Sequence, residues 1–225
     1  MAIILNIETA TTNCSVSLSK EGETFALLED YNNNYSHAER LHVYIEKILS
    51  ENQLEASQLN AIAVSKGPGS YTGLRIGVSA AKGLSFALNI PLISVSTLAA
   101  LTRQVQAESG VIIPMLDARR MEVYSAIFSS SFASIRIIEA QILDENSFAS
   151  YLENGKVYFV GNGVAKTKTL IAHKNAVFVE DKLPSANEMS MLAYHKYKKN
   201  DIEDVAYFEP YYLKDFLVTP AKKKV

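Results

Sequence analysis

The sequence predicts an α/β protein built from two lobes. Apolar segments of strand length alternate with helix-like segments along the whole chain of 225 residues. A strand followed by glycines and a helix occurs at residues 61–88, and the same order recurs from residue 157. Strand-like segments also open each half. We therefore expect an N-terminal lobe of residues 1–109 and a C-terminal lobe of residues 110–225, each a mixed β-sheet with helices.

The first lobe is expected to open with short strands and a capped helix. The strands are residues 3–7, 14–18 and 24–28. Ser36 and Glu39 have the spacing of a capping box, in which each side chain satisfies a backbone N–H group of the other residue. A helix should therefore run from His37 to about Glu51.

Residues 61–88 are the stretch around which this lobe is organised. An apolar strand ends at about Ser65, and Thr72 can cap a helix that begins at Leu74. Backbone N–H groups of the loop between them, with hydroxyl groups of the first hairpin, can bind a phosphate. The candidate residues are Thr11, Thr12, Gly67, Gly69 and Gly73. A tight turn that needs glycine explains the same glycines, and their spacing matches no standard nucleotide motif, so both interpretations stay open.

The remaining segments continue the alternation. Strands are expected at residues 92–95, 111–116, 123–128, 135–143, 157–160 and 177–179, and helices at residues 97–108, 146–152, from 163, and from 185 toward 198. Ser185 and Glu188 have capping-box spacing. The aromatic, proline-containing residues 207–214 predict an extended segment packed on a lobe.

Composition is that of an ordinary globular protein, with 48% hydrophobic and 20% charged residues. No segment is long and apolar enough to span a membrane, and the first residues lack the features of a signal peptide. The single cysteine, Cys14, is expected to be a small buried residue. A net charge of −2 gives no global attraction to nucleic acid. We expect a cytoplasmic protein, in which the lysines at residues 222–224 either form a solvated tail or contact phosphate.

The helix after the glycine loop is apolar around most of its circumference. At about 100° per residue, small residues form a ridge beside the flank that covers the home sheet. The ridge residues are Ile76, Ala80, Gly83 and Ala87, and Gly77 is predicted to belong to the same interface. The helix after Ser36 has an apolar face made of Ala38, Leu41, Tyr44, Ile45 and Ile48. Because small residues let another helix approach closely, we predict that these two faces form an oligomer interface; a helix of the same chain is the alternative.

Two sets of polar residues have both a functional and a structural interpretation. His37 and His42 are five positions apart, so on a regular helix they diverge by about 140° and cannot share a metal ion. We expect both at the surface and predict no metal site. Asp117, Arg119 and Glu122 occupy a turn between strands, where they could bind an anion or form an ion pair that closes the turn.

Several motifs together resemble one protein family. They are ILNIETATTNCSVSL, SHAERL, KGPGSYTGLRIGVSAAKGL, IPLISVSTLAAL, PMLDARRMEVYSAIF, PSANE and EPYYLK, and they span almost the whole chain. The order of elements in each half is similar to the actin, Hsp70 and sugar-kinase superfold. The motifs themselves resemble the TsaB (YeaZ) family, and GPGSYTGLRIG is shared with its catalytic relative TsaD. Glu8 and Ala10 stand where Asp and Ser are usual in the family.

The resemblance implies a non-catalytic subunit that supports tRNA modification. Its TsaD-like partner adds a threonylcarbamoyl group to N6 of the tRNA adenosine next to the anticodon. That relative carries a His-x-x-x-His metal pair after the strand that follows its glycine-loop helix, whereas residues 95–101 here contain no such ligand. The resemblance therefore implies no catalytic residue and no cofactor of the chain's own, with ATP or ADP only at the partner interface.

The resemblance also implies partners. They are the TsaD-like subunit, a TsaE-like ATPase in the same complex, a second copy of the chain when TsaD is absent, and tRNA through the complex, with no membrane. The alternative is a small ATP-dependent kinase or hydrolase of the same superfold, with Thr11, the glycine loop and residues 161–163 around a nucleotide. No carboxylate is evidently placed as its general base.

Overall fold

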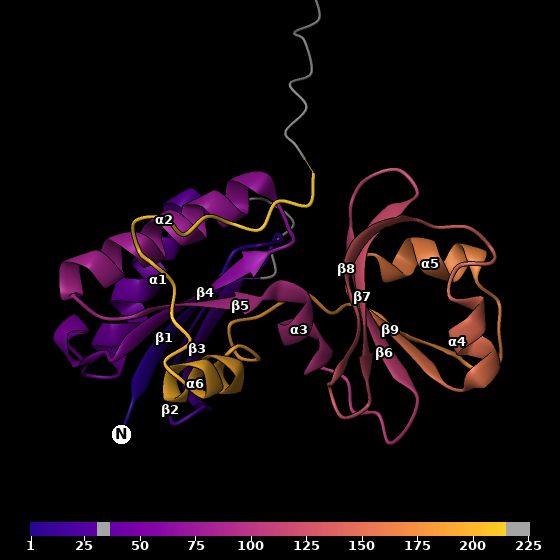
Figure 1. The fold of residues 1–225 in the computed structure, drawn as a ribbon. Helices are drawn as coiled ribbons and strands as arrows, with labels where there is room; N and C mark the ends of the chain where they lie inside the picture. The colour runs from indigo at the N-terminus through magenta and orange to yellow at the C-terminus, as the bar shows by residue number, and fades with distance from the viewer. Residues whose placement is uncertain (31–36, 215–225) are drawn as a thin grey trace, which may run out of the picture.

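The computed structural model describes residues 1–30 and 37–214, which form two lobes around two five-stranded sheets (Figure 1). The first sheet has the order β3-β2-β1-β4-β5, with β1 (Ile3–Glu8), β2 (Cys14–Lys20), β3 (Glu23–Asp30), β4 (Ala61–Gly67) and β5 (Leu92–Ser96). The second has the order β10-β9-β6-β7-β8, with β6 (Val111–Asp117), β7 (Glu122–Ser129), β8 (Ser134–Ile142), β9 (Val157–Val160) and β10 (Ala176–Val179).

The two sheets have the same connectivity. In the first, β1 pairs antiparallel with β2 and parallel with β4. In the second, β6 pairs antiparallel with β7 and parallel with β9. Both sheets continue with an antiparallel strand on one side and a parallel strand on the other. This repeat confirms the predicted α/β fold of two lobes with a mixed sheet in each.

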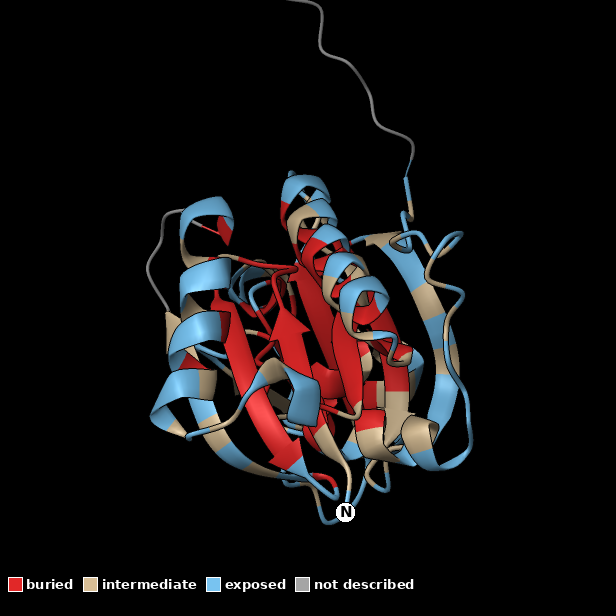
Figure 2. Ribbon diagram, turned by 90° about the vertical axis from the view of Figure 1, so that its left-hand side faces the viewer, coloured by how far each residue is buried: buried red, intermediate tan, exposed pale blue. Residues whose placement is uncertain are grey.

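Helices cover both faces of the first sheet. Helices α1 (His37–Glu51) and α2 (Tyr71–Leu88) lie on one face, and α6 (Ser190–Lys198) lies on the other (Figure 1). The short α3 (Thr97–Thr102) contacts both β5 and β6, and α4 (Ala149–Asn154) and α5 (Val164–Leu170) belong to the second lobe. A 3₁₀ turn, η1 (Ala56–Gln58), precedes β4. Figure 2 shows the consequence: the central strands are buried, and the helices are exposed on their outer sides.

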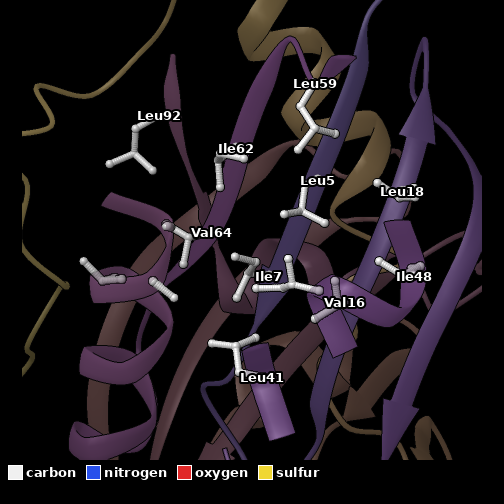
Figure 3. Close-up of a cluster of buried hydrophobic side chains, with 14 of the residues drawn as sticks. Leu5, Ile7, Val16, Leu18, Leu41, Ile48, Leu59, Ile62, Val64 and Leu92 are labelled. Atoms are coloured by element: carbon white, nitrogen blue, oxygen red, sulfur yellow. The ribbon is translucent and has the colours of Figure 1, made fainter. Parts of the chain in front are cut away.

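The core of the first lobe lies between its sheet and helices α1 and α2. Leu5 and Ile7 from β1 meet Leu41 and Ile48 from α1, and all four side chains are almost completely buried (Figure 3). Burying an aliphatic side chain of this size contributes about 1.5–3 kcal/mol, so this layer holds α1 on the sheet. Within residues 1–30 and 37–214, no helix combines the length and the apolar character needed to cross a bilayer.

Several element boundaries differ from the prediction. Strand β4 continues to Gly67, and α2 begins at Tyr71 instead of Leu74. Its N-cap is Ser70 rather than Thr72, because Ser70 Oγ accepts a hydrogen bond from the Gly73 N–H group at 3.3 Å. Helix α3 ends at residue 102 rather than 108, since the chain continues there in tight turns.

Of the two predicted capping boxes, one is wrong and the other involves a residue outside the described ranges. Ser185 does not cap α6, which begins at Ser190; its Oγ donates to Glu29 Oε2 at 2.7 Å and thereby ties this segment to the first sheet. The box of Ser36 and Glu39 cannot be described because Ser36 lies outside the described residues, as do the lysines at residues 222–224.

The chain returns to the first lobe after β10. Helix α6 packs on the first sheet, and Glu203 forms an antiparallel bridge with Leu92 of β5. Lys82 Nζ of α2 then donates to the Phe208 carbonyl oxygen at 2.9 Å, and the Tyr211 N–H group donates to the Lys66 carbonyl oxygen at 2.7 Å. The predicted C-terminal lobe of residues 110–225 therefore contains a long segment that packs on the N-terminal lobe instead.

Candidate functional site

The hairpin between β1 and β2 packs directly on the glycine loop and the start of α2. A β-carbon on Gly69 would lie 2.5 Å from the Ala10 carbonyl oxygen. The Ser70 N–H group donates to that same oxygen at 2.7 Å, and Thr9 Oγ1 donates to the Gly73 carbonyl oxygen at 2.8 Å. Side chains on these glycines would collide with the hairpin, so close packing accounts for them.

These contacts bear on the candidate phosphate residues. Gly69 and Gly73 lie against the hairpin, and Gly67 has φ +109°, which favours glycine in any case. Thr11 is buried and lines the cleft between the lobes, whereas Thr12 lines a separate pocket. Gly69 lines the same cleft as Thr11, whereas Gly67 and Gly73 line neither pocket. The tight-turn interpretation accounts for the glycines, and phosphate binding at this loop stays a prediction.

A groove of about 700 Å³ runs between α1 and α2 on the surface of the first lobe. We call it the α1–α2 groove; it is lined by Ala38, His42, Tyr71, Thr72, Arg75, Ile76, Ser79, Ala80, Gly83 and Leu84. A β-carbon on Gly83 would meet no heavy atom within 4 Å, and the nearby Ala87 is exposed. Small residues thus leave an open channel along α2 that has room for another helix.

Burial corrects which residues of the two predicted faces can meet a partner. On α1, Leu41, Ile45 and Ile48 are 0%, 6% and 1% exposed, because they pack on the first sheet (Figure 3). On α2, Gly77 is buried against Thr9. These four residues belong to the core of the lobe rather than to a surface. The apolar face of α1 was predicted as interface because a helical pattern shows an apolar stripe but not what covers it.

The other predicted interface residues remain accessible to different degrees. Ala38, Gly83 and Ala87 are exposed, and Tyr44 and Ile76 are partly buried. Ala80 is 8% exposed, yet it still lines the α1–α2 groove.

One exposed aromatic residue of this surface was not predicted. Phe86 is 82% exposed and lies seven residues after Ser79, so it continues the groove face of α2 toward its C-terminal end. Its signal in the sequence was its position on the narrow polar side of the helix. A large apolar side chain that is exposed beside an open groove is typical of an interaction surface.

An aromatic pair lies where the α1–α2 groove meets the cleft between the lobes. The Arg75 guanidinium donates to the Tyr71 hydroxyl oxygen at 2.9 Å and lies 5.1 Å from the centre of the same ring. The Tyr71 ring also packs in a tilted arrangement against the ring of Tyr212, which belongs to the returning C-terminal segment, with 5.1 Å between the ring centres. The C-terminal segment therefore borders both surfaces.

The cleft between the lobes has a volume of about 790 Å³. Its lining includes Thr11 and the glycine loop from the first lobe, Asp117, Arg119 and Asn162 from the second, and residues 211–214. The Lys214 ammonium contacts the Glu122 carboxylate, so the C-terminal segment spans from one lobe to the other. The cleft lining mixes polar and charged groups with apolar and aromatic ones, whereas small and apolar residues dominate the α1–α2 groove.

A carboxyl group lies buried beneath the hairpin. Glu8 is 0% exposed, and its Oε1 accepts from the Ala10 N–H group at 2.6 Å and from Ser65 Oγ at 2.7 Å. Burial raises the pKa of Glu8 to about 7, and the two hydrogen bonds oppose that rise. Glu8 does not line the cleft, so its geometry supports the hairpin rather than a reaction in the cleft.

The two histidines occupy different environments. His37 is 2% exposed, contrary to the expected surface position, because its Nε2 lies 2.6 Å from the Thr11 carbonyl oxygen. Burial lowers the pKa of His37, and that hydrogen bond opposes the shift. His42 is exposed in the α1–α2 groove. Cys14 is buried as expected, and burial raises the pKa of its thiol to about 11. The described part of the chain contains no group of three His, Cys, Asp or Glu residues that could hold a metal ion.

The fold and its surfaces define a class: a two-lobed α/β protein of the actin, Hsp70 and sugar-kinase type, with an open groove between two surface helices. Residues 33–222 match the family model described as TsaD, tRNA N6-adenosine threonylcarbamoyltransferase. The chain is also similar to a solved structure, YeaZ from Pseudomonas aeruginosa, with a TM-score of 0.79, 28% identity and coverage of 95% of this chain and 100% of that chain.

Two curated relatives narrow the class. Both are named tRNA threonylcarbamoyladenosine biosynthesis protein TsaB. The protein from Haemophilus influenzae is 31% identical, over 94% of this chain and 93% of its own length. The protein from Bacillus subtilis is 33% identical, over 75% of this chain and 74% of its own length. The chain belongs to the TsaB (YeaZ) family.

Proposed function

We propose that this chain acts in tRNA threonylcarbamoyladenosine biosynthesis as a non-catalytic subunit that pairs with a TsaD-like catalytic subunit. The observation that supports pairing is the α1–α2 groove, with Gly83 and Ala87 open to solvent and Phe86 exposed beside them. A helix from the partner can lie along the small residues of α2, and Phe86 can supply an apolar anchor. The names of the relatives in the TsaB family support the pathway.

The non-catalytic role is supported by the residues after β5. Residues 95–101 contain no histidine, cysteine or carboxylate at the position where the catalytic relative is expected to hold its metal. The chain would instead stabilise its partner's active conformation through the shared helices. Reconstitution of tRNA modification with each protein omitted in turn tests this role. Transfer of the threonylcarbamoyl group by this chain alone would contradict it.

The groove residues provide a direct test of pairing. Gly83→Arg and Ala87→Arg place a long charged side chain on the exposed part of α2, and each is expected to reduce association with the TsaD-like subunit by about 2–4 kcal/mol. Ser50→Arg is the matched control, because Ser50 is exposed on α1 but does not line the groove. Ala80 is a poorer choice since it is 8% exposed, so an arginine there also disturbs the core.

Size-exclusion chromatography and pull-down with the TsaD-like subunit give the measurement, and circular dichroism shows whether each variant is folded. The same variants should disrupt a homodimer of the isolated chain, because a second copy would use the same surface. Folded groove variants that associate as well as Ser50→Arg would show that the partner binds elsewhere.

A nucleotide is part of this proposal only at the partner interface. Gly69 and Gly73 pack on Ala10 and Thr9, and Gly67 lies against Tyr211 and Leu74, so packing accounts for these glycines without a nucleotide. ATP or ADP would then be held between the two subunits, and a TsaE-like ATPase would join the same complex. Titration with ATP, first with the chain alone and then with the TsaD-like subunit present, tests this. Tight binding or hydrolysis by the chain alone would favour the alternative, an ATP-dependent kinase or hydrolase.

A further inference from the structure

The turn between β6 and β7 carries two neighbouring arginines in an unfavourable backbone conformation. Arg119 has φ +67° and Arg120 has φ +51°. Residues with a β-carbon rarely adopt such angles, and glycine or asparagine forms a turn of this kind at lower cost. Unfavourable backbone angles persist where the surrounding structure compensates for them, and they cluster at functional sites. Two arginines at these positions therefore indicate a function that glycine could not provide.

The arginines do not close the turn by pairing with its acids. Asp117 Oδ2 pairs with Lys166 Nζ at 3.0 Å, and Lys166 Nζ also donates to the Arg120 carbonyl oxygen at 2.6 Å. The other acid, Glu122, contacts Lys214. Two lysines thus neutralise both carboxylates and fasten the turn. The ion pair between Arg119 and an acid of the turn, the structural interpretation of this motif, is not formed.

Both guanidinium groups are consequently available to a ligand. Arg119 and Arg120 are exposed, and neither side chain has a hydrogen bond or ion pair with any residue in the described ranges. Arg119, Arg120, Lys166 and Lys214 lie at or beside the turn, and the two ion pairs there use only the lysines, with Asp117 and Glu122. This local excess of positive charge stands in a chain whose net charge is −2.

We propose that this turn binds backbone phosphates of RNA. A guanidinium group presents N–H donors in a planar fork that matches phosphate oxygens. Arg119 lines the cleft between the lobes but Arg120 does not, so the pair extends from the cleft onto the open surface rather than enclosing one small anion. Exposed pairs hold a free anion weakly, whereas a polyanion adds their contributions to its other contacts. The inference rests on the proposed function, because tRNA is the polyanion on which that complex acts.

The test removes the two charges together. The full chain carrying Arg119→Gln and Arg120→Gln is combined with the TsaD-like subunit, and binding of a fluorescently labelled unmodified tRNA is measured by anisotropy over a series of salt concentrations. The affinity at low salt should fall by about tenfold or more, and the slope of log K against log salt concentration should become less steep by about two. The control carries Lys198→Gln and Lys199→Gln, which remove the same charge at the end of α6, outside the cleft. It should keep the wild-type slope.

A single variant separates a binding role from a structural one. Arg120→Gly removes the guanidinium and suits φ +51°, so it should raise the midpoint of thermal unfolding while weakening tRNA binding. A lower midpoint with unchanged tRNA binding would mean that Arg120 serves the fold, and would overturn the proposal. The proposal would also be overturned if the Arg119→Gln, Arg120→Gln variant kept the wild-type affinity for tRNA and the wild-type salt dependence. The same holds if that variant lost only the binding of a fluorescent ATP analogue.

Failure of the proposed function can be recognised separately. If the wild-type chain does not associate with the TsaD-like subunit, pairing fails, and the same tRNA titration is performed with the isolated full chain. Loss of affinity and slope in the Arg119→Gln, Arg120→Gln variant would still support the phosphate site. Equal binding by variant and wild type would overturn it.

Discussion

A β-carbon on Gly73 would lie 2.1 Å from the carbonyl oxygen of Thr9. The first turn of α2 is therefore packed against the backbone of the β1–β2 hairpin at a distance that only glycine permits. Gly77, one turn later, is almost as close, since its β-carbon would lie 2.2 Å from Thr9 Oγ1. The same hairpin borders the cleft between the lobes through Thr11, so this contact joins the groove helix to the cleft.

Alanine substitutions of the α2 glycines should distinguish destabilisation by steric collision from stabilisation by higher helix propensity. Gly73→Ala is expected to destabilise the protein by about 3 kcal/mol or more, because the neighbouring atom belongs to the backbone and cannot rotate away. Gly77→Ala should cost less, since the Thr9 side chain can move. Gly83→Ala, on the same helix with no atom near, should stabilise the protein by about 0.5–1 kcal/mol. Urea unfolding measures all three, and equal effects at Gly73 and Gly83 would contradict the packing argument.

Glu8 should make the protein less stable as the pH rises, which is the opposite of the usual effect of a carboxyl group. Burial raises its pKa from 4.5 to about 7, so the folded protein holds the proton more tightly than the unfolded chain. Its contribution to the free energy of unfolding is therefore full below pH 4.5 and decreases as the pH rises through about 7. Glu8→Gln cannot ionise, so relative to wild type it should gain about 3 kcal/mol over this interval.

The measurement for Glu8 is urea unfolding of wild type and variant at several pH values. Glu46→Gln, an exposed residue of α1, is the control and should leave the pH profile unchanged. A difference between Glu8→Gln and wild type that stays constant with pH would show that Glu8 does not titrate in this interval.

His37 should act in the opposite direction. Burial lowers its pKa from the ordinary value of 6.5, so the folded state binds the proton less tightly than the unfolded chain. Its stabilising contribution is present above pH 6.5 and is lost as the pH falls below that value. His37→Gln should remove this loss of stability at low pH. It should also lower the free energy of unfolding by about 1–3 kcal/mol near neutral pH, because the hydrogen bond to Thr11 is altered. His195→Gln on the exposed side of α6 is the comparison, and identical pH profiles for the two variants would argue against the prediction.

Local pattern predicted the elements well, because each depended on nearby residues. The strand, glycine loop and helix of residues 61–88 could be identified from apolar periodicity and glycine spacing alone. The cap of α2 was misplaced by two residues, since Ser70 and Thr72 are both acceptable caps and only the hairpin contact at Ser70 selects between them. The return of residues 190–213 to the first lobe depends on contacts far apart in sequence, such as Leu92 with Glu203, that no local pattern carries.

The candidate site was only partly predictable for a related reason. The wide apolar arc of α2 correctly indicated surface beyond what one sheet covers, and Gly83 and Ala87 are exposed there. On α1 the apolar stripe belongs to the hydrophobic core, because it is narrow enough for the first sheet to cover it. Phe86 was missed because the interface was predicted from the small and apolar residues of α2, whereas Phe86 lies on the narrow polar side of that helix, which is the exposed side.

The assignment of the α1 stripe to the core leads to the last prediction. Leu41 is 0% exposed and packs among residues of the first sheet, whereas Val43 on the same helix is 55% exposed. Leu41→Ala should therefore destabilise the protein by about 2–5 kcal/mol through lost burial and a residual cavity. Val43→Ala should change stability by no more than about 0.5 kcal/mol. Thermal and urea unfolding give these values, and pull-down with the TsaD-like subunit is performed at a temperature where both variants are folded. Both should then associate as wild type does, because neither side chain lines the α1–α2 groove. A Leu41→Ala variant that keeps wild-type stability but loses association would return the apolar face of α1 to the interface.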